Sequence, residues 1–237
     1  MKRLKLGILQ VNHDRSIEVG DAFPDDAHRF RDLFDAQEQR FDYRVYMTVG
    51  GEVPQDVDEQ DAYLITGSPE SILHELAFLD PLYDFIRRAD AVAKPLLGVC
   101  FGHQAIAAAL GGTVEQSDWN IGVETHTFLE HFDWMQPAQE DVNLHSFHHD
   151  TVTVLPQGCR RIAESPGCVN AGFAKGDHII TTQGHPEFTD RFMAGILEAT
   201  KHVLSATEVE VAEARAGMSS DGEVFAAWAT RFFGGTP

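Results

Sequence analysis

The chain has 237 residues, of which 37 are acidic and 18 are basic, so its formal net charge is −19. A field of that sign repels phosphate backbones and argues against a nucleic-acid partner. The hydrophobic fraction of 43% and the charged fraction of 23% are typical of a soluble globular protein. No stretch approaches the roughly 20 apolar residues that cross a bilayer, so we expect no membrane segment.

Apolar, β-branched runs alternate with helical segments along the first half of the chain. The amino terminus is basic and then apolar up to Gln10, which indicates a first strand rather than a secretory signal, so we expect a cytoplasmic protein. We expect strands at Leu4–Val11, Tyr43–Val49, Ala62–Thr66 and Pro95–Cys100, and helices at Asp25–Arg40 and Pro81–Ala93. This alternation predicts an α/β fold whose mainly parallel central sheet has helices on both faces.

In the second half, strand candidates follow one another closely, at Thr151–Leu155, Cys168–Ala174 and His178–Thr182. Their spacing indicates a local antiparallel hairpin or an added sheet. Ser205 with Glu208, and Ser220 with Glu223, match capping boxes of helices. Apolar side chains after Ser220 recur at helical spacing and predict one buried stripe, namely Val224, Phe225, Trp228 and Phe232. We expect a single domain over residues 1–237, with a core at about 4–190 and a helical segment at about 190–237.

The most informative segment runs from Pro95 to Leu110. An apolar strand leads into Gly98-Val99-Cys100-Phe101-Gly102, and an alanine-rich helix follows. This is the nucleophile-elbow pattern with cysteine in place of serine. A cysteine there lies near a helix N-terminus, whose partial positive charge favours a thiolate. The next N–H, that of Phe101, points to the place where an oxyanion forms.

A thiolate nucleophile needs a base, and the base needs an orienting group. His185-Pro186-Glu187 follows the strand candidate at His178–Thr182. In an extended segment His185 and Glu187 project to the same side, and Pro186 biases His185 towards that conformation. The pattern predicts a catalytic triad of Cys100, His185 and Glu187 at the C-terminal ends of strands, where open α/β sheets keep their sites.

With these motifs in place, the sequence resembles the class I (triad-type) glutamine amidotransferases. It is most similar to the glutaminase domain of GMP synthetase and its stand-alone relatives. The matching stretches, in family order, are Ile65–Pro69, Leu97–Gln104, Ala109–Gly112, His148–Asp150 with Leu155–Gly158, and Gln183–Glu187. The resemblance implies a flavodoxin-like class I glutamine amidotransferase domain.

The resemblance also implies a mechanism in which Cys100 attacks a γ-glutamyl amide carbonyl, His185 protonates the departing amine, and water releases glutamate from the thioester. Backbone N–H groups of Gly67 and Phe101 would form the oxyanion hole. Gln104 matches a position that helps to hold the substrate. The same comparison implies substrate-binding roles for three further residues, Ser68, Phe147 and His148.

The likeness to GMP synthetase ends with the glutaminase part, because these 237 residues show no P-loop and we expect no second domain to bind ATP. Either the ammonia passes to a separate synthetase subunit, or the protein itself hydrolyses a γ-glutamyl bond, as stand-alone γ-glutamyl peptidases do. Free glutamine and γ-glutamyl compounds both stay open as substrates.

Two rival interpretations remain. A PfpI-like cysteine protein shares the elbow and the sheet, but that group characteristically lacks the His-Pro-Glu segment. A non-catalytic or partner-gated regulatory subunit keeps the fold without turnover, and the intact triad argues against it. We expect no metal or cofactor, because no CxxC pair occurs and His145, His148 and His149 match none of the common zinc spacings.

Overall fold

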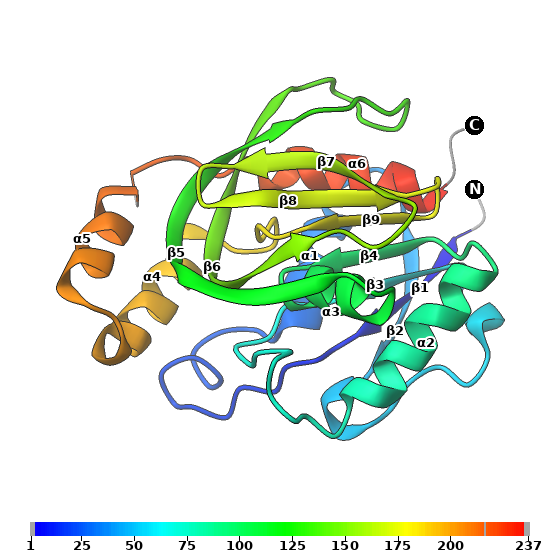
Figure 1. Ribbon diagram of the computed structural model, residues 1–237, viewed down its shortest axis with the longest axis horizontal. Coiled ribbons are helices and arrows are strands. Elements are labelled where there is room, and N and C mark those ends of the chain that lie inside the picture. The colour runs from blue at the N-terminus through cyan, green and yellow to red at the C-terminus, as the bar shows by residue number, and fades with distance from the viewer. Residues whose placement is uncertain (1–2, 216, 235–237) are drawn as a thin grey trace.

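The computed structural model describes residues 3–215 and 217–234, and within them a nine-stranded sheet runs through the molecule (Figure 1). The strands are β1 (Leu4–Leu9), β2 (Phe41–Tyr46), β3 (Ala62–Ile65), β4 (Leu96–Val99), β5 (Thr113–Phe128), β6 (Asp141–Val154), β7 (Cys159–Ser165), β8 (Cys168–Lys175) and β9 (Ile179–Thr182). Their order across the sheet is β2-β1-β3-β4-β9-β8-β7-β5-β6.

We call β2, β1, β3, β4 and β9 the parallel half, because each of these strands runs parallel to its neighbours within this group. β3 and β4 are short, apolar and buried along their whole length. Such strands are typical of a sheet that is covered on both faces. The four strands predicted in the first half of the sequence are confirmed, although β2 occupies Phe41–Tyr46 rather than Tyr43–Val49.

We call β8, β7, β5 and β6 the antiparallel half, because every pairing from β9 outward is antiparallel. The prediction of a mainly parallel sheet is therefore wrong, and the sheet is mixed. The antiparallel addition expected in the second half is present, but β5 and β6 are longer than anything predicted there, with 16 and 14 residues. They carry many polar side chains, so they contain few of the apolar runs on which the prediction depended.

The helices cover both faces of the sheet, as predicted. They are α1 (Asp26–Asp35), α2 (Leu79–Ala91), α3 (Phe101–Ala109), α4 (Asp190–Thr200), α5 (Ala206–Arg215) and α6 (Gly222–Gly234). α1 and α6 share one hydrophobic cluster with Leu64 of β3, whereas α2 and α3 share another with its neighbour Ile65. Successive strand residues point to opposite faces, so the two clusters lie on opposite sides. No helix in the described part of the chain is long and apolar enough to cross a membrane.

The C-terminal segment is helical, as predicted. The capping box at the start of α5 is confirmed, since Ser205 N donates to Glu208 Oε2 at 2.7 Å and Glu208 N donates to Ser205 Oγ at 3.3 Å. The second box is wrong, because the Ser220 hydroxyl donates to the Asn143 carbonyl instead. The predicted stripe packs into the core of the α1 face, with Trp228 fully buried.

Candidate active site

Cys100 lies at the turn between β4 and α3. Its φ of +49° and ψ of −103° are values that residues other than glycine rarely adopt. The turn is anchored because Cys100 N donates to the Thr182 carbonyl of β9 at 2.8 Å. The strained backbone therefore directs the Cys100 side chain out from the C-terminal edge of the parallel half.

The two glycines that flank the turn are required by close packing. A Cβ at Gly98 would lie 2.6 Å from the Gly102 carbonyl oxygen, and a Cβ at Gly102 would collide with the Ile65 carbonyl. Gly98 and Gly102 thus allow α3 to start directly against β3 and β4. The spacing that indicated an elbow in the sequence has this steric cause.

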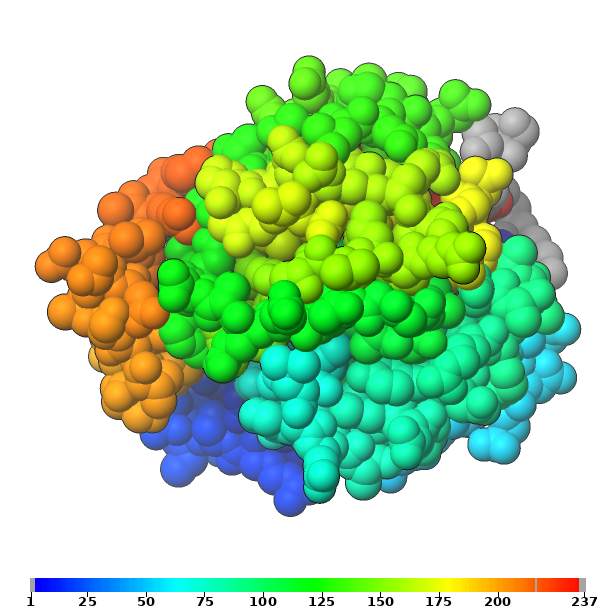
Figure 2. Space-filling view, in the orientation of Figure 1, coloured from blue at the N-terminus to red at the C-terminus, as the bar shows by residue number. Residues whose placement is uncertain are grey.

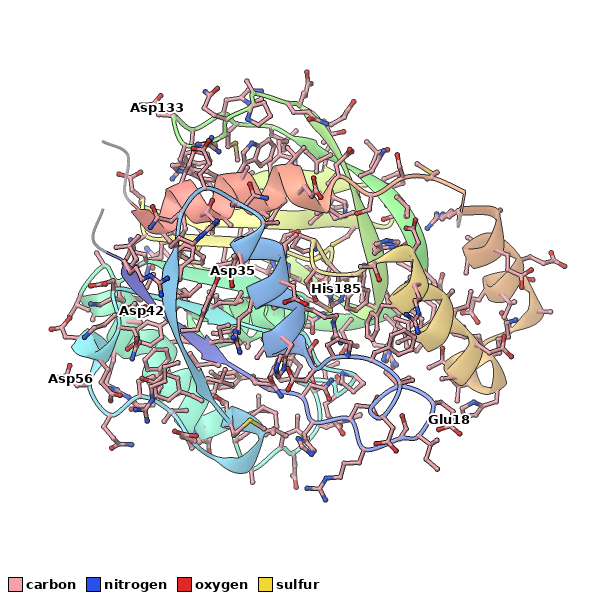
Figure 3. All side chains as sticks on the ribbon, turned by 180° about the vertical axis from the view of Figure 1, so that it is seen from behind. Glu18, Asp35, Asp42, Asp56, Asp133 and His185 are labelled. Carbon is pink, nitrogen blue, oxygen red and sulfur yellow. The ribbon has the colours of Figure 1, made fainter. Side chains whose placement is uncertain are left out.

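His185 and Glu187 follow β9, next to the end of β4. Glu187 Oε1 lies 2.7 Å from His185 Nδ1, and both side chains are buried. Figure 3 shows His185 in the middle of the molecule, between α1 and α4. A Cβ placed on Gly67 would lie 2.8 Å from His185 Cε1 and 3.7 Å from Cys100 Cβ, so His185 and Cys100 face the same point. The structure brings Cys100, His185 and Glu187 together.

The electrostatics of His185 favour an imidazolium. Burial lowers its pKa, but the charges of Glu187 and Cys100, together with hydrogen bonds to both, outweigh burial and raise the pKa to about 10. Gln183 adds a donor on the other side of the cysteine, with its Nε2 3.5 Å from Cys100 Sγ. The arrangement therefore suits a thiolate–imidazolium pair.

The ring and the backbone of His185 are both held in place. The Phe188 ring stacks on the imidazole, with 3.8 Å between ring centroids and 15° between planes. His185 N donates to the His145 carbonyl of β6 at 2.7 Å, which forms an isolated bridge between the two segments. The imidazole is thus held by Phe188 from the segment between β9 and α4, and the His185 backbone is held by β6 of the antiparallel half.

Gly67 and Phe101 stand on two sides of Cys100. Within the described residues, neither the Gly67 N–H nor the Phe101 N–H has a hydrogen-bond partner, and Phe101 is the first residue of α3. Gly67 also has to be glycine, because a side chain there would meet His185. Both N–H groups are available to a developing oxyanion, so their assignment to the oxyanion hole stays a prediction with a suitable geometry.

A cavity of about 130 Å³ opens in front of His185. Two of the predicted substrate-binding residues, Ser68 and Phe147, line it together with Gly67. Phe188, Phe192 and neighbouring apolar groups form the opposite wall. The cavity is large enough for a small acyl or amine group and lies beside the ring that would transfer a proton.

Gln104 and His148 do not line this cavity. Gln104 Nε2 donates to the Asp150 carbonyl at 2.9 Å, and it lies 3.3 Å from the Gln183 side-chain oxygen. His148 is buried between Asn120 and the Asp150 carbonyl, and burial lowers its pKa to about 3. Direct substrate contacts of these two residues stay predictions that their placement does not favour. Across the described residues, no group of three or more potential ligands could hold a metal ion.

Three residues near the site were absent from the sequence prediction, namely Asn12, Asp26 and Arg29. They line the cavity from the segment after β1. Asp26 accepts hydrogen bonds from Asn12 at 3.0 Å and from Arg29 at 2.5 Å. Burial raises the pKa of Asp26, and the Glu187 charge adds to the rise although Arg29 opposes it. The available signal was the position of Asn12 just beyond the C-terminal end of a parallel strand.

Comparison with known proteins assigns the family. The family model "Glutamine amidotransferase class-I" matches residues 41–199. The chain belongs to the class I glutamine amidotransferases. Gamma-glutamyl peptidase 3 of Arabidopsis thaliana is 27% identical over 164 residues, which cover 65% of this chain and 66% of that protein. Gamma-glutamyl peptidase 2 of the same plant is 28% identical over 178 residues, which cover 71% of each chain.

Two further proteins are similar to this amidotransferase. One subunit of the "GMP synthase [glutamine-hydrolyzing]" of Methanosarcina barkeri is 33% identical over 132 residues, which cover 55% of this chain and 66% of that protein. A glutamine amidotransferase structure from Thermotoga maritima superimposes with a TM-score of 0.71 at 20% identity, covering 99% of this chain and 100% of that one. The second likeness supports the mixed α/β fold.

Proposed function

We propose that this amidotransferase is a cysteine-dependent hydrolase that cleaves the amide bond of a γ-glutamyl compound through a Cys100 thioester. The observation that carries the proposal is the elbow of Cys100 beside the His185–Glu187 pair. Similarity to gamma-glutamyl peptidases supports a substrate in which the γ-carboxyl carries an amine larger than ammonia.

In the first half-reaction the Cys100 thiolate attacks the γ-carbonyl carbon. The carbonyl oxygen becomes an oxyanion that the Gly67 and Phe101 N–H groups receive. The His185 imidazolium gives its proton to the amide nitrogen, the carbon–nitrogen bond breaks, and the neutral amine leaves. Glu187 holds the ring through Nδ1 and stabilises its positive charge.

In the second half-reaction the neutral His185 ring takes a proton from water while the water oxygen attacks the thioester carbon. The carbon–sulfur bond then breaks, which releases glutamate and restores the thiolate–imidazolium pair. Phe188 keeps the ring in one orientation for both transfers. The strand order β2-β1-β3-β4-β9 of the parallel half supports a flavodoxin-like assignment, for which a site outside the C-terminal ends of the strands is expected.

The deciding experiment incubates the purified protein with glutamine and with a panel of γ-glutamyl peptides and amines, and measures glutamate release beside Cys100→Ser. Preference for γ-glutamyl compounds supports a self-sufficient hydrolase. Release that survives Cys100→Ser would contradict the mechanism.

A second candidate is the ammonia-supplying subunit of a separate synthetase, which the 33% identity to the Methanosarcina barkeri protein favours. Release from glutamine alone, increased by a co-purifying synthetase, would support this candidate. No release under any condition would favour a non-catalytic or partner-gated subunit.

A further inference from the structure

A second cavity, of about 260 Å³, lies between the β5–β6 hairpin and the pair α4 and α5. These two helices project at one end of the molecule, beside β5 and β6 (Figures 1 and 2). The cavity has apolar walls, formed by Val123, Met193, Ala194, Leu197 and Ala212. Cavities of roughly 150 Å³ with such walls accept molecules the size of benzene, so this one has room for a short alkyl chain.

One buried polar side chain lines the cavity. It belongs to His145, with only 3% of the side chain exposed. Asp190 Oδ1 lies 3.2 Å from His145 Nε2, yet neither ring nitrogen has a well-aligned hydrogen-bond partner among the described residues. Native proteins pair nearly all buried polar groups, so the ring depends on the Asp190 carboxylate at the cavity for its nearest partner.

The charges at the mouth of the cavity select the sign of that ligand. Three carboxylates line it, those of Asp190, Glu198 and Glu213, against one ammonium group. That group, on Lys201, lies 2.8 Å from Glu198 and 3.6 Å from Glu213, so both of those carboxylates already have a cation. The carboxylate next to His145 has no lysine or arginine beside it in the described structure.

We propose that this cavity is a second binding site, which takes a small primary alkylammonium ion. The alkyl chain lies against Met193 and Leu197, and the ammonium group donates to the Asp190 carboxylate beside the His145 ring. Burial lowers the pKa of His145, so the ring next to Asp190 adds no positive charge that would repel the ammonium. An alkyl carboxylate of the same length would be repelled by Asp190.

The site has a direct connection to the catalytic histidine. The His145 carbonyl accepts the hydrogen bond from His185 N, and Asp190 begins α4 just after the Phe188 ring that stacks on His185. An ammonium bound to Asp190 therefore lies beside both segments that position the imidazole. Binding of the ammonium should therefore change turnover by way of His185. That effect on turnover rests on the proposed function, whereas the binding itself does not. An amine is also what that reaction releases, so the site would respond to a product-like molecule.

The test is titration with n-butylammonium chloride at constant ionic strength, followed by NMR of the protein amides. Cys100→Ser is titrated in parallel. Potassium butyrate and 1-butanol are the matched probes of charge and of apolar binding. We expect saturable binding of butylammonium and at least tenfold weaker binding of butyrate and butanol.

Two single substitutions at the mouth remove the same charge from different places. Asp190→Asn should weaken butylammonium binding at least tenfold, whereas Glu198→Gln, whose carboxylate pairs with Lys201, should change it less than threefold. Both residues are 74% exposed, so either variant should fold. Ala194→Phe, at an exposed position of α4, should block the cavity and abolish binding.

Three results would each overturn the proposal. They are absence of saturable binding, equal effects of the two charge variants, and binding that persists in Ala194→Phe. The last result would locate the amine in the catalytic cavity instead. Because binding is measured without turnover, and also with Cys100→Ser, failure of the hydrolase proposal would leave this result standing. If butylammonium changes the rate of glutamate release by the wild-type protein but not by Asp190→Asn, the connection to His185 is established.

Discussion

The two halves of the sheet contribute different things to one site. The parallel half supplies the proposed reacting groups, since Gly67 follows β3, Cys100 follows β4 and His185 follows β9. The antiparallel half supplies the surroundings, namely the Phe147 wall and the His145 carbonyl that accepts from His185 N. In this proposal the strand ends of the buried, apolar half carry the chemistry, and the longer, more polar strands border it.

The halves also differ in what they bury. β3 and β4 bury only apolar side chains or glycine, whereas β5 and β6 bury three histidines, which are His126, His145 and His148. The difference teaches that pH acts on the two halves in different ways. It acts on the proposed chemistry through His185 after β9, and on stability through the buried histidines of β5 and β6.

Replacement of the nucleophile should give the largest effect. Cys100→Ser should lower kcat for glutamate release by roughly 10³-fold or more, as loss of a nucleophile does elsewhere. The thermal midpoint should change little, because serine is nearly isosteric. An active-site titration with a thiol reagent supplies the control, and a variant that keeps more than a tenth of the wild-type rate would break the assignment of chemistry to the parallel half.

A methyl group on Gly67 should give the next largest effect. The Cβ would lie 2.8 Å from His185 Cε1, so Gly67→Ala should displace the imidazole or the N–H and lower kcat/KM by about 10²-fold. Gly50→Ala is the matched control, since a Cβ there meets nothing within 4 Å. Equal activity of the two variants would count against the oxyanion role.

The pH dependence of activity reports on His185. Its folded pKa of about 10 lies above the usual value of 6.5. The imidazolium therefore contributes its full stability to the folded state below about pH 6.5. That contribution is lost as the pH rises through about 10. We expect an alkaline limb of kcat/KM near that pH. Glu187→Gln removes the largest cause of the rise and should move the limb down by roughly one unit or more. An unmoved limb would mean that Glu187 does not control the ring.

The prediction with the smallest effect on activity at neutral pH concerns acid stability, and it belongs mostly to the antiparallel half. Burial lowers the pKa of His148 and His103 to about 3 and that of His126 to about 4. The unfolded chain binds these protons near pH 6.5, so unfolding free energy should fall as pH drops from about 6.5 towards 4, by up to roughly 1.4 kcal/mol per pH unit for each ring. Urea unfolding at pH 7 and 5 measures the slope, and His126→Phe should flatten it. A slope equal in wild type and variant would contradict this account.

Sequence patterns were sufficient for the parallel half. β3 and β4 are continuous apolar runs, and the glycines at positions 98 and 102 make the elbow visible because close packing leaves no room for a side chain. The same patterns missed β5 altogether, whose first residues Glu115, Gln116 and Ser117 are exposed. A strand whose side chains face solvent, or whose buried positions hold histidine, has no apolar periodicity to detect.

The candidate site divides in a similar way. Cys100, His185 and Glu187 could be proposed from the sequence because a nucleophile and its base have recognisable neighbours there, and the structure brings the three side chains together. Asp26 and Arg29 were missed, since nothing in their local sequence says that α1 begins beside Glu187. His148 was expected at the substrate, but pairing of β5 with β6 places it against Asn120. Such contacts depend on strand register, which a single sequence does not reveal.

The positive φ of Cys100 has a consequence for folding as well as for chemistry. A residue held in that region costs about 1–3 kcal/mol, and glycine adopts it with little strain. Cys100→Gly should therefore be at least as stable as Cys100→Ala, although both lack the thiol. On stability alone glycine would suit this turn better than cysteine. With Cys100 there, the native state gives up part of its folding free energy to hold a thiol in a fixed direction.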